Sequence, residues 1–137
     1  MKRLWLPLAM IAVLVAIAVA GYWAKRPAEA EPIACVDPVV GCDFRHRGAS
    51  AGIRFSQLPL PLEPFVLSVK APDSARVSAE FHMVGMDMGF NRYDLRPQAT
   101  GEFSSRITLP VCVSGRRDWM LYVDIDGTRY ALPFSSR

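Results

Sequence analysis

A run of twenty-one residues without a charged side chain, from Leu4 to Ala24, constrains this chain more than any other feature. As a helix, such a run covers the ~30 Å hydrocarbon core of a bilayer, because each residue adds ~1.5 Å. Lys2 and Arg3 precede it, and tryptophan and tyrosine lie near its two ends, as in the aromatic belts of membrane proteins. The sequence therefore predicts a transmembrane anchor within residues 1–24.

A cleaved signal peptide is the alternative reading of the same run, with Ala18-Val19-Ala20 as the processing site. The apolar region of a signal peptide is usually ~7–15 residues long, which is shorter than this run and favours an uncleaved anchor. The short N-terminal tail carries basic but no acidic residues, which favours a cytoplasmic N-terminus. Everything after the anchor is then expected outside the cytoplasm.

The formal net charge of +3 is concentrated at the N-terminus. Of sixteen basic residues, two precede the anchor, which leaves fourteen against thirteen acidic residues, or +1, in the rest. This balance gives no indication of nucleic-acid binding. Residues 25–34 are polar and contain prolines, so we expect a juxtamembrane linker there, followed by one exported domain over residues 35–137.

Apolar and polar residues alternate in several short segments of that domain. In 65–70, 76–83, 103–109, 119–125 and 130–134, apolar residues share one parity, as in strands with one buried face. The side chains expected in the core are Phe65, Leu67, Val69, Val77, Ala79, Phe81, Met83, Phe103, Ile107, Leu109, Trp119, Leu121, Val123, Ile125, Tyr130, Leu132 and Phe134.

Turn signals separate these segments. Asp126-Gly127 predicts a type I′ hairpin turn, while the prolines of Leu58–Pro64 predict an extended stretch that cannot be helical. Two weaker segments, Gly52–Gln57 and Asn91–Arg96, bring the count to about seven strands. The predicted fold is all-β: an immunoglobulin-like β-sandwich of about seven strands, preceded by one N-terminal transmembrane helix.

Three cysteines leave one thiol over when a single disulfide forms. Cys35 and Cys42 are the nearest pair, with a proline and a glycine between them, and are the first candidates for a disulfide in an exported domain. Pairing of Cys112 with either of them is an alternative, and redox cycling of Cys35 and Cys42 is a further, less favoured one. A lone Cys112 is expected to be either buried or a thiolate ligand.

The stretch from Phe81 to Tyr93 combines His82 with three of the six methionines. Two glycines bracket Met86 and Met88, which indicates a loop. Thioethers beside an imidazole are soft ligands that select Cu(I), so His82, Met86 and Met88 form a candidate copper site, with Cys112 as an additional ligand. Met83 has core parity and is the weakest candidate. The alternative is a flexible apolar tip that contacts a partner.

Motifs of common enzyme classes are absent from the sequence. It contains no G-x-S-x-G elbow, no phosphate-binding loop, no G-x-G-x-x-G and no H-E-x-x-H. Glu80 and His82 share a strand face, but such a pair is also an ordinary solvent-facing one. We therefore expect a protein that is not an enzyme.

These residues also carry a resemblance to a known group of proteins. The succession Phe81-His82-Met83-x-Gly85-Met86-x-Met88-Gly89, then Leu109-Pro110-x-Cys112 and Asp118-Trp119, resembles small membrane-anchored periplasmic proteins of the FixH-like and YtkA-like type. Those proteins are immunoglobulin-like domains with a methionine-rich loop, linked with copper delivery or cytochrome oxidase maturation. The Cys35–Cys42 segment has no place in that pattern.

The resemblance implies a copper-related role for Met86 and Met88, followed by His82, Met83 and Cys112. It further implies a copper chaperone or oxidase-assembly protein, anchored by a single span in a bacterial inner membrane, with its domain in the periplasm. Its partner would belong to a membrane complex or a copper-transfer pathway. The competing hypothesis is an interaction module without a metal, in which the methionine loop is a contact tip.

Overall fold

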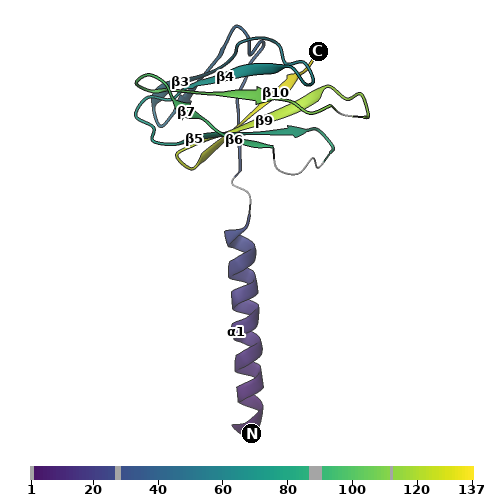
Figure 1. The fold of residues 1–137 in the computed structure, drawn as a ribbon. Coiled ribbons are helices and arrows are strands. Elements are labelled where there is room, and N and C mark those ends of the chain that lie inside the picture. Colours follow the sequence, from purple (N-terminus) through teal and green to yellow (C-terminus); the bar gives the residue numbers. More distant parts are fainter. Residues whose placement is uncertain (1, 27–28, 87–90, 112) are drawn as a thin grey trace.

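The computed structural model of this protein describes residues 2–26, 29–86, 91–111 and 113–137. It consists of one N-terminal helix, α1 (Lys2–Ala24), and a β-rich domain (Figure 1). The helix segment Leu4–Ala24 is long and apolar enough to cross a membrane, and its side chains are exposed.

Ten strands over the described residues form two five-stranded sheets. The first sheet contains, in spatial order, β1 (Glu31–Pro32), β10 (Thr128–Ser135), β9 (Asp118–Ile125), β5 (Val77–Met83) and β6 (Arg92–Asp94). The second contains β2 (Cys42–His46), β3 (Ala49–Phe55), β4 (Pro64–Lys70), β8 (Glu102–Thr108) and β7 (Arg96–Pro97). Only β1 and β10 are parallel among these pairs.

The inner faces of the two sheets share one hydrophobic core. Every side chain that the alternation predicted to be inside is buried. Aromatic rings join the sheets: Phe55 and Phe134 have ring centroids 5.1 Å apart, and Phe65 and Phe81 have theirs 6.1 Å apart. Burying a phenylalanine of this kind stabilises a fold by roughly 1.5–3 kcal/mol, so the alternating residues hold the sheets together.

The domain has more strands than the predicted number of about seven. β1 and β2 come from segments that showed no clear alternation, and 91–96 divides into β6 and β7, which belong to different sheets. Leu95, between these two strands, is buried and donates its N–H to the carbonyl of Val77. The chain therefore crosses from one sheet to the other at Leu95, a step that strand periodicity does not reveal.

His46 is one of the polar residues that the fold buries. It ends β2, is only 4% exposed, and its Nδ1 shares a 2.8 Å hydrogen bond with the hydroxyl of Tyr130 on β10. This bond joins the second sheet to the first. Burial raises the pKa of Tyr130, and the nearby carboxylate of Glu31 raises it further, although Arg47 partly opposes both.

The predicted type I′ turn is consistent with the backbone. Asp126 has a φ of 47° and Gly127 a φ of 87°, and this turn type requires positive φ at both central residues. The Asp126 carboxylate also accepts the backbone N–H groups of Ala75 (3.1 Å) and Arg76 (2.8 Å). The β9–β10 hairpin is thereby attached to the loop that precedes β5.

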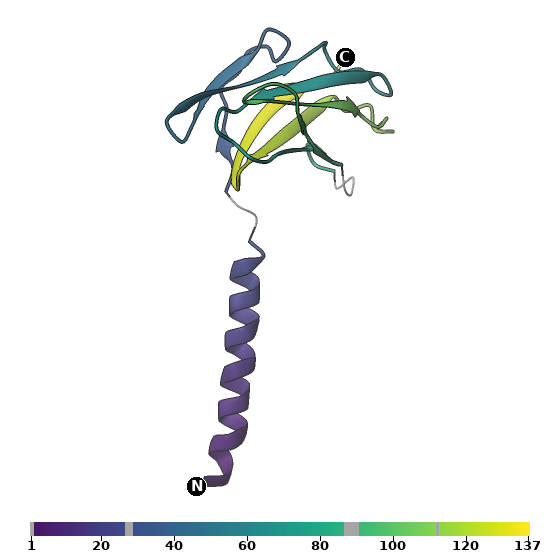
Figure 2. The same ribbon diagram turned by 60° about the vertical axis from the view of Figure 1, so that its left-hand side comes forward.

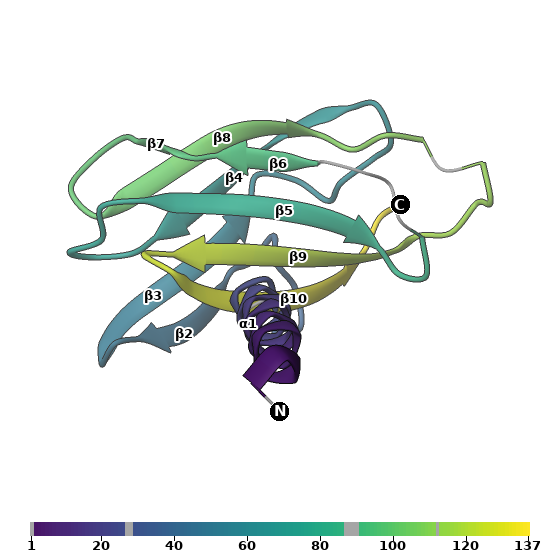
Figure 3. The same cartoon turned by 90° about the horizontal axis from the view of Figure 1, so that it is seen from below.

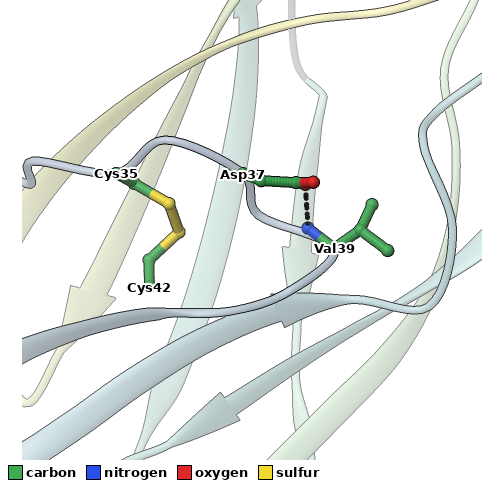
Figure 4. The surroundings of a disulfide bond; sticks show 4 residues. All are labelled: Cys35, Asp37, Val39 and Cys42. Carbon is green, nitrogen blue, oxygen red and sulfur yellow. Dashed lines mark hydrogen bonds between the residues drawn. A yellow bond between two sulfur atoms is a disulfide. The ribbon is translucent and has the colours of Figure 1, made fainter.

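A disulfide joins Cys35 and Cys42, the nearest pair in the sequence (Figure 4). Within the closed loop, Asp37 Oδ1 accepts the N–H of Val39 at 2.8 Å. Cys42 starts β2 and is buried, so the covalent link fixes the entry of the chain into the second sheet. Cys112 lies outside the described residues.

Candidate functional site

The pairing of β5 with β9 places His82 opposite Met120, a methionine outside the predicted set of ligands. Their strand neighbours Phe81 and Leu121 point into the core, so His82 and Met120 lie on the outer face of the first sheet. Residue parity assigns Met120 to that face. The sequence contains no signal for the register that brings it beside the histidine.

A hollow of about 830 Å³ opens on this outer face. His82, Met86 and Met120 line it, and Glu29 and Ala30, which precede β1, form another part of its wall. Figures 2 and 3 show that the sheet of β5, β9 and β10 is on the side of the domain nearer to α1. The hollow is thus lined by one histidine and three methionines, Met83, Met86 and Met120, close to where the chain leaves the helix.

A tight turn after β5 places Met86 at the hollow. The Met86 N–H donates to the carbonyl of Met83 at 3.2 Å, and the Val84 N–H donates to the carbonyl of Asp118 at 3.0 Å. Gly85 has a φ of 79°, which favours glycine at this position. Met86 keeps 41% of its surface exposed, so a solute can reach it.

The other predicted ligands are placed differently. Met83 borders the hollow, but its side chain is only 2% exposed and belongs to the core, as its strand parity requires. Met88 and Cys112 lie outside the described residues, so their distances to His82 stay untested. The structure thus brings three of the five predicted ligands, His82, Met83 and Met86, to the hollow, although the Met83 side chain is buried, and it adds Met120.

Charged groups beside the hollow form one connected cluster. Glu80 accepts from His82 through Oε1 and from Arg129 through Oε2, each at 2.8 Å, and Arg129 also donates to Asp124 at 3.3 Å. Partial burial raises the pKa of Glu80, but the hydrogen bonds from Arg129 and His82 outweigh it and hold the pKa below its usual value. Glu80 is therefore ionised at neutral pH.

Tyr122 supports this cluster from the middle strand. The guanidinium carbon of Arg129 lies 4.4 Å from the centre of the Tyr122 ring, within the range of a cation–π contact. The ring also meets the His82 imidazole edge-to-face, with centroids 5.4 Å apart. Both contacts restrict the rotamers of the side chains that border the hollow.

A metal site made of carboxylate, imidazole and thiolate groups alone does not occur in the part of the chain that the structure describes. No three His, Cys, Asp or Glu side chains come together there as such a site requires. A site at the hollow that used the methionine sulfur atoms would favour soft ions, and Cu(I) is one that thioethers select.

The exposed apolar tip is the name used here for four exposed side chains in two loops: Val84 and Met86 after β5, and Val111 and Val113 between β8 and β9. Val113 is fully exposed and Val111 is 53% exposed. Arg116 Nη1 donates to the carbonyl of Val84 at 2.9 Å, so the β5–β6 and β8–β9 loops meet at this end of the domain. Apolar side chains that gather on a surface are typical of a contact site.

Comparisons with known proteins add no name to this arrangement. No protein-family model, curated protein or solved structure matches the chain.

Proposed function

We propose that this protein is a membrane-anchored copper-handling protein that binds Cu(I) at the hollow through His82, Met86 and Met120. The observation that carries the proposal is the pairing of His82 with Met120, together with the turn that brings Met86 to the same hollow. One imidazole and two thioethers are a donor set of the soft kind that favours Cu(I). The resemblance to FixH-like and YtkA-like proteins points to the same ion.

The ligands suit carriage of the ion better than catalysis. Met86 is exposed and sits on a turn, so an incoming ligand can replace it without disturbing the sheet. Thioethers are uncharged and carry no proton on sulfur, so Cu(I) can be transferred by ligand exchange without release or uptake of a proton by the methionines. We propose that the protein passes Cu(I) to a membrane complex such as a cytochrome oxidase under assembly, and that it is not an enzyme.

The strand order supports an immunoglobulin-like fold within this proposal. In the first sheet β10, β9, β5 and β6 follow the order G-F-C-C′, and in the second β3, β4, β8 and β7 follow A-B-E-D. β1 and β2 extend one edge of each sheet. In this fold, loops gather at the two ends of the sandwich, which is where the turn with Met86 lies.

The tether places the hollow near the bilayer if α1 remains as an anchor. Glu29, which lines the hollow, follows Ala24 by five residues, a separation of at most ~18 Å in extended chain. An acceptor within that reach would be a membrane protein rather than a freely diffusing one. We propose a bacterial inner membrane with the domain in the periplasm, where the Cys35–Cys42 disulfide can persist.

Copper uptake by the full chain in detergent tests this proposal. Titration with Cu(I) against a coloured competing chelator should show about one bound ion per chain. The Met86→Leu/Met120→Leu variant should lose that uptake, because leucine preserves side-chain volume and removes the sulfur. Met83→Leu is the matched control and should retain it. Equal uptake by the wild type and the double variant would refute the proposal.

The exposed apolar tip favours a second function, a metal-free interaction module. Here Val84, Val111 and Val113 would contact a membrane partner, and the anchor would hold the domain beside it. Loss of cross-linking to that partner on Val113→Asp, in a chain that binds no copper at any stage, would support it. Retention of the partner by Val113→Asp would count against it.

A further inference from the structure

Arg129 is held by three contacts that together fix its guanidinium. One nitrogen donates to Glu80 at 2.8 Å, the other donates to Asp124 at 3.3 Å, and the group stacks on the Tyr122 ring at 4.4 Å. The side chain is 19% exposed, so these contacts are partly shielded from water. A guanidinium whose two terminal nitrogens are hydrogen-bonded and whose face stacks on a ring is a rigid donor.

Glu80 divides its two oxygens between Arg129 and His82. Arg129 occupies Oε2, and Oε1 accepts from Nε2 of the imidazole at 2.8 Å. Because an ionised carboxylate only accepts, Nε2 carries a proton, and in the neutral imidazole Nδ1 is then the nitrogen with a lone pair. The terminal torsion angle of a glutamate has a broad distribution, so the hydrogen bond from Arg129 to Oε2 restricts the position of Oε1.

We propose that Arg129 is a positioning residue for Cu(I): through Glu80 it fixes the ring orientation and tautomer of His82, so that Nδ1 faces the ion. This inference rests on the proposed function. Histidine ligands of metals commonly give their other ring nitrogen to a carboxylate, and loss of such an outer partner costs ~10–100-fold in affinity. Arg129 extends this chain by one further residue, from a third strand.

A positioning role for Arg129 and simple charge repulsion predict opposite changes in Cu(I) affinity when Arg129 is replaced. An arginine near a bound cation repels it, so removal of the charge alone would strengthen binding. If Arg129 acts through Glu80, its removal weakens binding instead. Arg106, exposed on β8 in the other sheet, is the matched control for loss of one positive charge.

The test measures Cu(I) affinity of the full chain by chelator competition in the wild type, Arg129→Gln, Glu80→Gln, the double variant and Arg106→Gln. In Glu80→Gln, an NH₂ donor replaces one of the two carboxylate oxygens, so only one of the two positions that meet Arg129 and His82 still holds an acceptor. We expect Arg129→Gln to bind ~10-fold more weakly or worse, and Arg106→Gln to bind as the wild type does. The double variant should bind Cu(I) no more weakly than Glu80→Gln alone, because both changes break the same chain of hydrogen bonds from Arg129 through Glu80 to His82.

A second readout needs no copper. The nitrogen-15 spectrum of the His82 ring in the metal-free chain should show the proton on Nε2 in the wild type and a mixture of tautomers in Arg129→Gln. Equal or tighter Cu(I) binding by Arg129→Gln, or a His82 spectrum that does not change, overturns the positioning role alone. Absence of Cu(I) uptake by the wild type overturns the proposed function and this inference together.

Discussion

Among single residues, Asp126 has the most direct link to pH. Its carboxylate accepts the backbone N–H groups of Arg76 and Ala75, and these bonds lower its pKa from the usual 3.8. A depressed pKa in the folded chain means that the ionised form stabilises the fold. This contribution is present above the unfolded pKa and is lost as the pH falls through the folded one.

Asp126→Asn should therefore be less stable than the wild type at pH 7, and the difference should shrink as the pH falls below 3.8. Asparagine suits the first position of a type I′ turn, so the hairpin itself is retained. Denaturant unfolding at a series of pH values measures the difference. Asp73→Asn, at another residue with positive φ, controls for the loss of one charge. A difference that stays constant with pH would contradict the role of Asp126.

The parity of residues along each strand could be predicted from the sequence, but their neighbours on other strands could not. Alternation correctly assigned Phe81 and Trp119 to the core, because one buried face imposes a period of two. The contacts of His82 with Met120 and of Arg129 with Glu80 depend on the register between strands. Register is set by turns and packing that a single strand does not contain.

At the scale of elements, strong alternation and turn chemistry identified β4, β5, β8, β9 and β10. The edge strand β1 was not predicted because it has only two residues, both exposed, and β2 was not predicted because the residues that it buries, Cys42 and His46, are not those of a typical apolar strand face. Their place is set by tertiary bonds instead, such as that from the Ile33 N–H to the carbonyl of Ala131 at 2.8 Å. The fold class was thus predictable, while the edges of its sheets were not.

The Cys35–Cys42 disulfide should stabilise the domain through the loop that it closes. For so short a loop, the entropy lost by the unfolded chain corresponds to ~2–3 kcal/mol. The Cys35→Ala/Cys42→Ala variant should lose about that much free energy of unfolding in urea. The wild type with its disulfide reduced should show the same decrease in the free energy of unfolding. A decrease below ~0.5 kcal/mol would contradict the expected contribution.

At the scale of the whole molecule, the hollow is held near the bilayer only if α1 stays attached to the domain. An uncleaved anchor predicts that the membrane fraction of a bacterial host holds the chain at its full 15.2 kDa. The measurement is the intact mass of the purified protein. A mature chain that starts after Ala20 would show instead that the helix is a leader and that the domain is released.

The central claim is that Met120 and His82 hold one Cu(I) together. X-ray absorption of the copper-loaded full chain counts sulfur and nitrogen neighbours of the metal directly. The wild type should show both sulfur and nitrogen scatterers, and Met120→Leu should lose sulfur while it keeps nitrogen. A Met120→Leu spectrum identical to that of the wild type, or a wild-type spectrum without nitrogen, would contradict the site.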